Sequence, residues 1–500
     1  MFETAELGQS VVNGDFKKRE LQLRAELLTL QYRLHDSAKF PVIIDFAGVD
    51  GAGKGTTINM LNKWMDPRHL RTTGYVAPTS SETGRPRFWR YWRDMPPKGG
   101  IGLFLTGRYS KPLMDFVYGR IDELEFDEEL SKIIRFETAL VEDGALILKF
   151  WMHLSSEHQK ERLEALSADA DNAYRVRDLD WRNRERYDDF IRAAERIITR
   201  TNKGRAPWTI VEGVDPNYRH LRVGEIIADQ LARHLDRSHH APPADFGVHT
   251  HVEEASHRHT PLPPTVFDKL DMSSTIRKSD YKKKLPAIQS HLGELGRKAY
   301  EKGQSTVLVF EGPDASGKGG AIRRTVWSLD ARSYRVHQFA APTEHERKFH
   351  YLWRFWNRLP EAGHVSVFDR SWYGRVLVER VEGFASEDEW RRAYNEINEF
   401  ESQIVEHGIV LIKFWIHVSK EEQLRRFEKR RDSLYKHWKL TEEDWRNREE
   451  FETYEQMGND IVQYTSTKEA PWILIEGDSK HHARLKVMQT VIDHLEPRVE

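Results

Sequence analysis

The sequence repeats itself at one fixed interval, and this repeat limits the possible architecture more than any other feature. Two glycine-rich strings carry Lys54 and Lys318, which lie 264 residues apart. The same interval separates KFWMHLS at 149–155 from KFWIHVS at 413–419, and DWRNRE at 180–185 from DWRNRE at 444–449. Because strings of different character share one spacing, we infer that the chain consists of two copies of one folding unit.

The 500 residues therefore divide into two domains of a size that a single hydrophobic core supports. We expect an N-terminal domain over residues 1–236, a linker over 237–265 and a C-terminal domain over 266–500. The linker is rich in His and Pro and lacks helical or strand periodicity. Its histidines have no cysteine or carboxylate at a usual ligand spacing, so we interpret it as a solvated linker rather than a metal site.

Composition excludes several classes of protein. No apolar run approaches the roughly 20 residues of a membrane-spanning helix, and the N-terminus lacks the pattern of a signal peptide. We therefore expect a cytoplasmic protein that does not contact membranes. The chain contains no Cys, which excludes disulfides and a cysteine nucleophile. Its net charge of −2 argues against a nucleic-acid-binding protein but leaves room for a local basic patch.

Short apolar runs alternate with long charged stretches in each copy. Such runs are typical of buried parallel strands, and the charged stretch 386–408 is typical of a helix. Strands that alternate with helices form a parallel sheet covered on both faces, so we predict two tandem α/β domains. The predicted strands cover 41–48, 101–106, 145–154 and 208–213 in the first copy, and 305–312, 365–369, 409–418 and 472–477 in the second.

Residues 312–319 spell GPDASGKG, which has the G-x-x-x-x-G-K core of a Walker A phosphate-binding loop. The backbone N–H groups of such a loop and the start of the next helix cradle an anion, and Lys318 adds a positive charge. One glycine-rich loop alone would be weak evidence for phosphate binding. This loop follows a predicted strand, precedes a predicted helix and occurs twice, so we interpret it as a true P-loop.

The residue after the loop lysine is Gly319 in the second copy and Gly55 in the first. A Walker A loop usually has Ser or Thr there, whose hydroxyl contacts Mg²⁺. A bound Mg²⁺ therefore needs other ligands. Asp314 in the loop and Asp369 at the end of the 365–369 strand are the candidates, because the carboxyl ends of neighbouring strands converge on the phosphate site. The alternative role for Asp369 is a helix or turn cap.

The strings GPDASGKGG, VFDRSWYGR, RRFEKRR and WKLTEEDWRNR closely resemble those of the polyphosphate kinase 2 family, and the resemblance covers nearly the whole chain twice. It implies P-loop kinase domains related to thymidylate kinase, each with a helical lid. The fused arrangement is similar to the subgroup that phosphorylates AMP to ADP with inorganic polyphosphate. The resemblance implies catalytic roles for Asp314, Lys318, Asp369 and Arg370, with Asp314 and Asp369 as the metal ligands and a basic lid at 425–439.

The basic lid also has a chemical rationale. Phosphoryl transfer depends on positioning and on neutralising negative charge, so a polyanion site should be dense in Lys and Arg. A solvated helical face is the alternative for such a charged stretch. The predicted phosphate- or nucleotide-binding residues are Gly312, Gly317, Gly319, Gly320, Arg375, Arg425, Arg426, Lys429, Arg430, Arg431, Lys436 and Lys439.

The constant offset allows the two copies to be compared position by position, and they differ in chemistry. Asp369 corresponds to Leu105 and Arg370 to Thr106, so the first copy lacks the second carboxylate and the cation beside it. Most lid cations are also replaced: Arg425, Lys429, Arg430, Arg431 and Lys436 become Glu161, Ala165, Leu166, Ser167 and Asn172. The first copy keeps Asp50 and Lys54. We therefore predict a first domain that folds but has lost transfer chemistry, with a structural or polyphosphate-guiding role.

Three further motifs receive structural interpretations. In YLWRFWNRLP at 351–360, Leu352, Phe355 and Trp356 have helical spacing and predict a core-facing stripe rather than a base-stacking platform. The string DWRNR occurs in both copies, and Thr441, three residues before Asp444, resembles a helix cap. We therefore interpret this string as structural. Tyr373 is retained as Tyr109, which favours packing over catalysis.

The sequence thus predicts an Mg²⁺-dependent transfer of a phosphoryl group from polyphosphate to AMP in the C-terminal domain. Two alternatives remain open at this stage. One is an ATP-dependent nucleoside monophosphate kinase, and the other is a non-catalytic regulator that binds polyphosphate or a nucleotide. Polyphosphate and AMP or ADP are the expected partners, and a homo-oligomer is compatible with the sequence.

Overall fold

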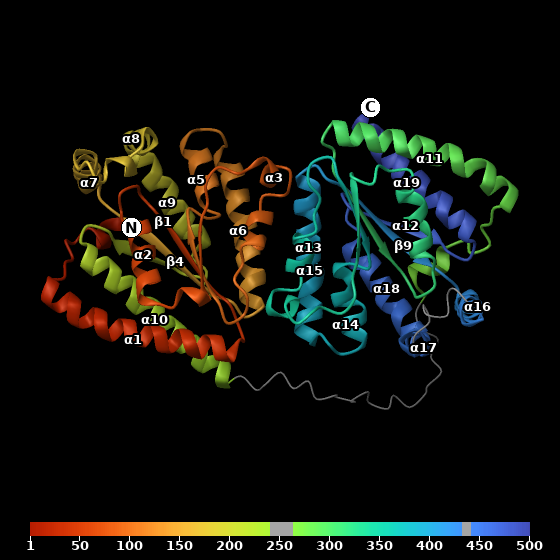
Figure 1. Cartoon of the computed structure of the whole chain (residues 1–500), viewed down its shortest axis with the longest axis horizontal. Helices are drawn as coiled ribbons and strands as arrows, with labels where there is room; N and C mark the ends of the chain where they lie inside the picture. The colour runs from red at the N-terminus through yellow and green to blue at the C-terminus, as the bar shows by residue number, and fades with distance from the viewer. Residues whose placement is uncertain (241–263, 433–441) are drawn as a thin grey trace. The chain divides into compact units, whose positions relative to one another are not determined.

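The computed structural model describes residues 1–240, 264–432 and 442–500, and these form two compact units with one sheet each (Figure 1). Each sheet is parallel and has five strands, in the order β2-β3-β1-β4-β5 in the first copy and β7-β8-β6-β9-β10 in the second. The order is the same in both, as duplication predicts. The strands are β1 Val42–Gly48, β2 Leu70–Gly74, β3 Ile101–Leu105, β4 Leu146–His153, β5 Trp208–Glu212, β6 Thr306–Glu311, β7 Tyr334–Gln338, β8 Val365–Asp369, β9 Val410–His417 and β10 Trp472–Glu476.

All eight predicted strands are confirmed, and the two strands missing from the prediction are equivalent edge strands. Among the described residues, β2 pairs only with β3, and β7 pairs only with β8. Three of the five residues in each are exposed to solvent, and their sequences, LRTTG and YRVHQ, contain no apolar run. An edge strand with so little buried surface has no hydrophobic signature to detect.

Helices connect the strands and cover both faces of each sheet. The longer helices of the first copy are α1 Asn13–Ser37, α2 Lys54–Trp64, α5 Ser110–Val117, α6 Glu123–Glu142, α7 Ser156–Ala168, α8 Asp178–Glu185, α9 Tyr187–Thr201 and α10 Pro216–His240. Those of the second copy are α11 Lys278–Glu301, α12 Lys318–Val326, α15 Glu387–Glu406, α16 Lys420–Arg431, α17 Glu442–Glu449, α18 Phe451–Thr465 and α19 Lys480–Val499. The short helices are η1 Phe2–Ala5, η2 Pro67–His69, α3 Ser80–Thr83, α4 Trp89–Arg93, η3 Ala173–Arg175, η4 Val266–Lys269, η5 Glu346–Lys348, α13 Trp353–Trp356, η6 Trp372–Val376 and α14 Val378–Val381.

The main core of the second copy lies between its sheet and the helices α11, α12 and α19. Leu308 and Ile412 of the strands pack with Val487 and Met488 of α19 in one buried apolar cluster. Figure 1 shows α11 and α19 on one side of this sheet and α15 on the other. Because both faces are covered, the strand sequences are apolar at almost every position instead of alternating.

The opposite face of the same sheet carries an aromatic layer. The ring of Phe400 on α15 contacts the rings of Trp356 and Trp372, with 4.8 Å between centroids in each pair. Leu352, Phe355 and Trp356 are buried, which confirms the core-facing stripe predicted for this segment. Edge-to-face ring pairs of this kind stabilise a core by about 1 kcal/mol beyond their buried area.

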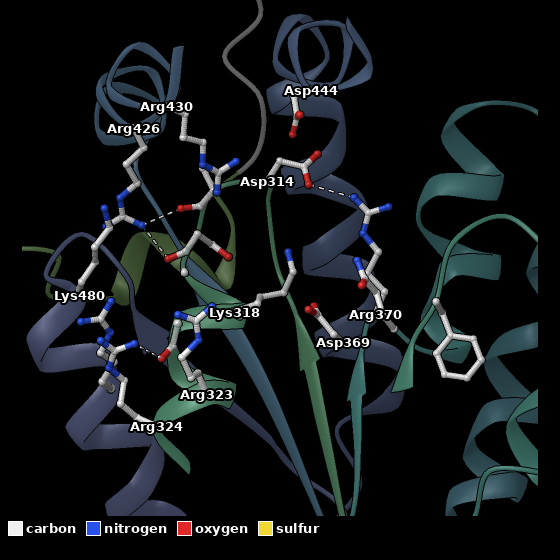
Figure 2. Close-up of a pocket in the computed structure, with 18 of the residues that line it drawn as sticks. Asp314, Lys318, Arg323, Arg324, Asp369, Arg370, Arg426, Arg430, Asp444 and Lys480 are labelled. Atoms are coloured by element: carbon white, nitrogen blue, oxygen red, sulfur yellow. Dashed lines mark hydrogen bonds and ion pairs between the residues drawn. The ribbon is translucent and has the colours of Figure 1, made fainter. Parts of the chain in front are cut away.

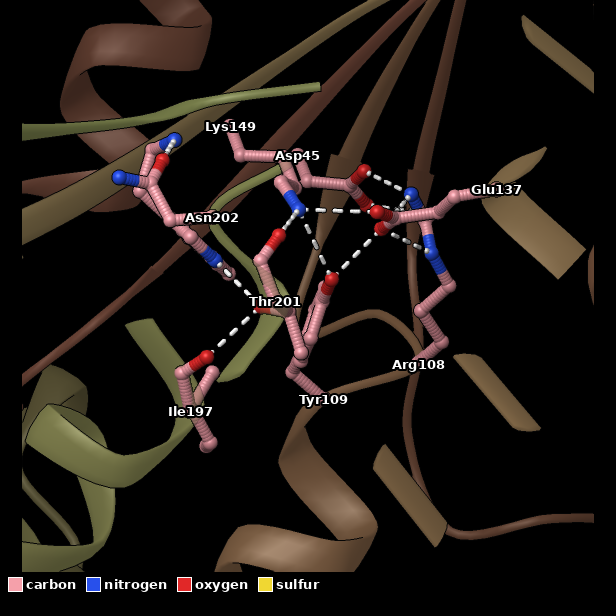
Figure 3. Close-up of polar contacts among 9 residues, drawn as sticks. Asp45, Arg108, Tyr109, Glu137, Lys149, Ile197, Thr201 and Asn202 are labelled. Carbon is pink, nitrogen blue, oxygen red and sulfur yellow. Dashed lines mark hydrogen bonds and ion pairs between the residues drawn. The ribbon is translucent and has the colours of Figure 1, made fainter. Parts of the chain in front are cut away.

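A buried polar network crosses the core of the first copy (Figure 3). The Lys149 ammonium donates hydrogen bonds to Glu137 Oε2 at 2.8 Å and to the Tyr109 hydroxyl at 3.1 Å. Arg108 donates from Nη2 to Glu137 Oε1 at 2.7 Å and from Nη1 to Asp45 Oδ1 at 3.0 Å. Glu137 therefore neutralises two buried cations at once, and desolvation raises the pKa of Asp45 to about 6 despite the charge of Arg108.

The second copy has a simpler version of this network. Lys413 donates to Glu401 Oε2 at 2.6 Å and to the Tyr373 hydroxyl at 3.0 Å. The arginine of the first copy is replaced by Trp372, whose indole N–H donates to Glu401 Oε1 at 2.9 Å. Val309 stands where the first copy has Asp45. Tyr373 is fully buried, which agrees with the packing role expected for it.

Two sequence interpretations touch the undescribed segments. Helix α10 extends to His240, and most of the predicted linker, residues 241–263, lies outside the described residues. Thr441, the predicted helix cap, also lies outside them. In the described part of the chain, every helix is too short or too polar to cross a membrane.

Candidate active site

The phosphate loop of the second copy connects β6 to α12, as the sequence predicts. Gly312 begins the loop at φ +131°, and a Cβ there would lie 2.3 Å from the carbonyl oxygen of Ile416, so only glycine fits. Lys318 folds back over the loop and donates to the carbonyl oxygens of Gly312 and Pro313 at 2.6 and 3.1 Å. Burial lowers the pKa of Lys318, although the negative charges of Asp314 and Asp369 oppose this shift.

Asp314 is held in place from two sides. Its Oδ1 accepts a hydrogen bond from Arg370 Nη2 at 2.9 Å, and its Oδ2 accepts one from Asn447 Nδ2 at 3.0 Å. Burial alone would raise the pKa of Asp314, but the charges of Lys318 and Arg370 outweigh it and hold the pKa below its usual value. Asn447 belongs to the repeated DWRNRE string, so this string reaches the site, which its structural interpretation did not predict.

Asp369 and Arg370 lie where β8 ends, beside the phosphate loop. Figure 2 shows the Lys318 ammonium between the carboxylates of Asp314 and Asp369. Within the described part of the chain, the Asp369 carboxylate has no hydrogen-bond or ion-pair partner. Arg370 has a left-handed backbone at φ +62°, a conformation that non-glycine residues adopt at a cost of about 1–2 kcal/mol and mostly where function requires it.

Arg426 of α16 fastens the phosphate loop to its surroundings. Its Nη1 donates to the carbonyl oxygens of Ala315 and Ser316 at 2.8 and 2.7 Å. Its Nη2 donates to Gly477 and Asp478, and its Nε to the Glu422 carboxylate. A guanidinium has five N–H donors, so Arg426 is fully occupied and positions the loop.

These residues open onto a cleft of about 940 Å³ whose walls are strongly basic (Figure 2). Nine of the described residues that line it are Lys or Arg, and four are Asp or Glu. The cations are Lys318, Arg323, Arg324, Arg370, Arg426, Lys429, Arg430, Lys480 and Arg484. The pKa of Lys480 is lowered to about 8, mainly by burial and next by repulsion from Arg426. An excess of nine cations over four carboxylates favours a multiply charged anion.

Most of the predicted site residues line this cleft. They are Asp314, Gly317, Lys318, Gly319, Gly320, Asp369, Arg370, Arg426, Lys429 and Arg430. Three predicted cations lie elsewhere. Arg375 pairs with Glu379 at 3.3 Å and stacks on the ring of Tyr351. The exposed side chains of Arg425 and Arg431 pair with the nearby carboxylates of Glu422 and Asp432. Lys436 and Lys439 lie outside the described residues.

Four cations of the cleft were missed because they lie outside every recognised string. Arg323 and Arg324 lie on α12, and Lys480 and Arg484 lie on α19, so the fold brings together residues about 160 positions apart. A comparison of the two copies at these positions could have identified them. The equivalent positions in the first copy are Asn59, Met60, Pro216 and His220, so all four charges are specific to the second copy.

The first copy retains the shape of the phosphate loop without the basic cleft. Lys54 donates to the carbonyl oxygens of Gly48 and Val49 at 2.7 and 2.8 Å, and Asn183 donates to Asp50 Oδ2 at 2.8 Å. These contacts match those of Lys318 and Asn447. Of the nine cleft cations, however, only two have a cationic counterpart in the first copy, namely Lys54 and Arg162.

Comparison with known proteins agrees with this geometry. The chain is 44% identical over 502 residues to the polyphosphate:AMP phosphotransferase of Pseudomonas aeruginosa, with 99% of each chain covered. It is 34% identical over 504 residues to a protein of the same name from Acinetobacter johnsonii, with 99% of this chain and 98% of the relative covered. A crystal structure described as polyphosphate kinase 2 from P. aeruginosa matches with a TM-score of 0.87 and 43% identity over 99% of each chain.

The model of the family described as Polyphosphate kinase 2 matches residues 11–239 and again residues 275–499. Both copies are therefore covered, as the repeated motifs predicted. The chain belongs to the polyphosphate kinase 2 family.

Proposed function

We propose that this protein transfers the terminal phosphoryl group of inorganic polyphosphate to AMP, forming ADP, and that the second copy carries out the chemistry. The observation that carries this proposal is the basic cleft around the phosphate loop of the second copy, whose cations are mostly absent from the first. AMP as the acceptor is supported by the relatives that match over the full chain, which are named polyphosphate:AMP phosphotransferases.

The donor would lie along the wall of the cleft that Arg323, Arg324, Lys480 and Arg484 form, which we call the basic wall. Loop N–H groups and Lys318 suit the phosphates nearest the reaction, because helix starts and P-loops bind anions in this way. Arg323, Arg324, Lys480 and Arg484 suit the following phosphates, and no described carboxylate forms an ion pair with any of the four. Four such cations beyond the phosphate loop fit a chain of phosphates better than the tail of a nucleotide.

The carboxylates of Asp314 and Asp369, on either side of Lys318, fit Mg²⁺. Within the described residues, no group of three His, Asp or Glu side chains forms a complete metal cage. Mg²⁺ usually takes only one or two carboxylates, and its remaining ligands are water and substrate phosphates. Asp369 has no hydrogen-bond or ion-pair partner among the described residues, and Asp314 is firmly oriented, so these two would hold the ion. When bound, Mg²⁺ would neutralise charge on the transferred group and help to align it.

The remaining residues would act by position and charge. An oxygen of the AMP phosphate forms a bond to the terminal phosphorus, while the bond from that phosphorus to the next phosphate oxygen breaks. The polyphosphate leaves one phosphate shorter, and no side chain needs to remove a proton because the AMP phosphate is already ionised. Arg370 and Lys318 would stabilise the negative charge that spreads over the transferred group.

The proposal is tested by incubating the purified protein with long polyphosphate, Mg²⁺ and each of AMP, GMP, ADP and GDP, followed by separation of the nucleotides. We expect ADP from AMP as the main product. ADP formation with ATP as donor but none with polyphosphate would instead identify a nucleoside monophosphate kinase. Saturable polyphosphate binding without any product would identify a regulator.

The basic wall gives a prediction of its own. In the double variant Lys480→Ala with Arg484→Ala, we expect the KM for long polyphosphate to rise about tenfold or more. Each lost charge-assisted hydrogen bond to phosphate is worth roughly 1.5–3 kcal/mol in favourable geometry. Arg425→Ala is the matched control, because Arg425 is a lid cation of similar charge that is 75% exposed and pairs with Glu422. Equal effects in both variants would contradict the assignment.

A further inference from the structure

A buried carboxylate lies at the end of β6, directly before the phosphate loop. Glu311 is 2% exposed, and the four residues of β6 that precede it are all apolar. Burial raises the pKa of Glu311, and the hydrogen bond from Ser371 and the charges of Lys318 and Arg370 oppose this shift. Glu311 forms no ion pair within the described residues. A buried carboxylate without an ion-pair partner costs stability, so packing alone gives no reason for Glu311.

The Glu311 carboxylate binds the turn that follows β8. The buried hydroxyl of Ser371 donates to Glu311 Oε1 at 2.8 Å. Backbone pairing of the two strands stops just before this point, where Phe310 lies opposite Asp369 and the Arg370 N–H donates to the Phe310 carbonyl oxygen at 3.2 Å. The side-chain bond therefore joins β6 to the turn one residue beyond the last backbone bond. It connects the start of the phosphate loop with the turn that carries Asp369 and Arg370.

The first copy lacks both members of this pair. Ala47 corresponds to Glu311, and Gly107 corresponds to Ser371. The turn itself forms without them, because Thr106 keeps the left-handed backbone at φ +52° and its hydroxyl donates to the carbonyl oxygen that follows β2 at 2.7 Å. The pair is therefore not needed to fold the turn, and it is absent from the copy that also lacks the second carboxylate and the arginine of the site.

We propose that Glu311 and Ser371 are a positioning pair, whose hydrogen bond fixes the distance between the phosphate loop and the turn after β8. This inference rests on the proposed function, because that reaction needs Asp314 of the loop and Asp369 of β8 to hold one ion. The pair touches no reacting atom and acts through Asp369 and Arg370, which directly precede Ser371. A displacement of about 1 Å between such elements can lower a rate about a hundredfold.

Glu311→Ala and Ser371→Ala should each lower kcat for ADP formation about tenfold or more, the usual effect of losing a group that orients functional residues. The KM for polyphosphate should change less than about twofold, because the basic wall is untouched. The double variant should be no more than about twofold worse than the poorer single variant, since both changes remove one bond. Glu311→Gln keeps an acceptor oxygen for the hydroxyl and should retain about a third or more of the wild-type kcat.

Ser366→Ala is the matched control for these variants. Ser366 is a buried serine near the other end of β8, and its hydroxyl donates to the carbonyl oxygen of Arg358 at 2.9 Å. Its loss removes a comparable hydrogen bond from the same strand, so kcat should stay within about twofold of the wild type. Wild-type kcat in both Glu311→Ala and Ser371→Ala, or an equal fall in Ser366→Ala, overturns the inference.

Hydrogen exchange on the full chain tests the pair without reference to activity. The amides of residues 370–373 should exchange about tenfold faster in Glu311→Ala than in the wild type, because the turn opens more readily. Ser366→Ala should leave the exchange of this segment unchanged. Unchanged exchange in Glu311→Ala overturns the inference, whatever the activity. If the wild-type protein forms no ADP from polyphosphate, the proposed function fails, and hydrogen exchange still decides whether the pair holds the turn.

Discussion

Asp369→Asn is expected to lower polyphosphate-dependent ADP formation by about a thousandfold or more. The Asp369 carboxylate lies beside Lys318 and has no ion-pair partner in the part of the chain that the structure describes. An amide has neither the charge to hold Mg²⁺ nor the charge to balance the surrounding cations. Losing one charge contact that acts in the transition state costs roughly 3–4 kcal/mol, and losing a metal ligand costs more. The measurement is kcat at saturating polyphosphate, AMP and Mg²⁺.

The first copy provides the matched control for this variant. Leu105→Asp places a carboxylate at the equivalent position but leaves Thr106, Ala165 and Leu166 in place of the nearby cations. We expect no activity from this change in an Asp369→Asn background, because a single carboxylate cannot replace a basic cleft. Full activity of Asp369→Asn alone would show that the metal assignment is wrong or that the first copy is catalytic.

Glu401→Ala and Glu137→Ala are expected to destabilise their own copies by about 3–5 kcal/mol each. The substitution leaves the buried ammonium of Lys413 or Lys149 without its carboxylate, and an uncompensated buried charge has a cost of this size. We expect the larger loss in the first copy, because Glu137 also neutralises Arg108, which would keep only Asp45.

This prediction is measured by hydrogen exchange of the strands β4 and β9 in urea, since the two copies need not unfold together. Glu387→Ala at the exposed start of α15 is the control and should cost less than about 1 kcal/mol. The double variant Glu401→Leu with Lys413→Met removes both charges and should recover much of the loss. A single Glu401→Ala variant as stable as the wild type would contradict the role of the network.

The two copies show that fold and chemistry depend on different residues. Each copy keeps the sheet order, the phosphate-loop contacts and a buried lysine paired with a buried glutamate. Thr106 even keeps the left-handed backbone of Arg370, at φ +52°. The cleft charges that the first copy lacks, such as Asp369, Lys429 and Lys480, are exposed or half-buried in the second copy, and replacing such charges costs little stability. We therefore expect the first copy to remain a stable domain without transfer activity.

The sequence predicted the central strands and the phosphate loop because both depend on local signals. A buried parallel strand is apolar at nearly every position, and the P-loop follows such a strand directly. The edge strands β2 and β7 were missed for the opposite reason, since most of their residues face solvent. Asn447 was assigned a structural role because its string occurs in both copies, although its side chain binds the loop aspartate in each.

By itself the sequence determined the duplication, the α/β class, the family and the loss of Asp369 and Arg370 from the first copy, since all of these follow from strings and from one constant offset. Only the tertiary structure decided which cations line the cleft. It placed Arg323 and Arg324 of α12 beside Lys480 and Arg484 of α19, and it turned Arg375 away toward Glu379. The physical reason is that electrostatic attraction depends on distance in space, and charges from distant parts of the chain come together only when the sheet orders its helices.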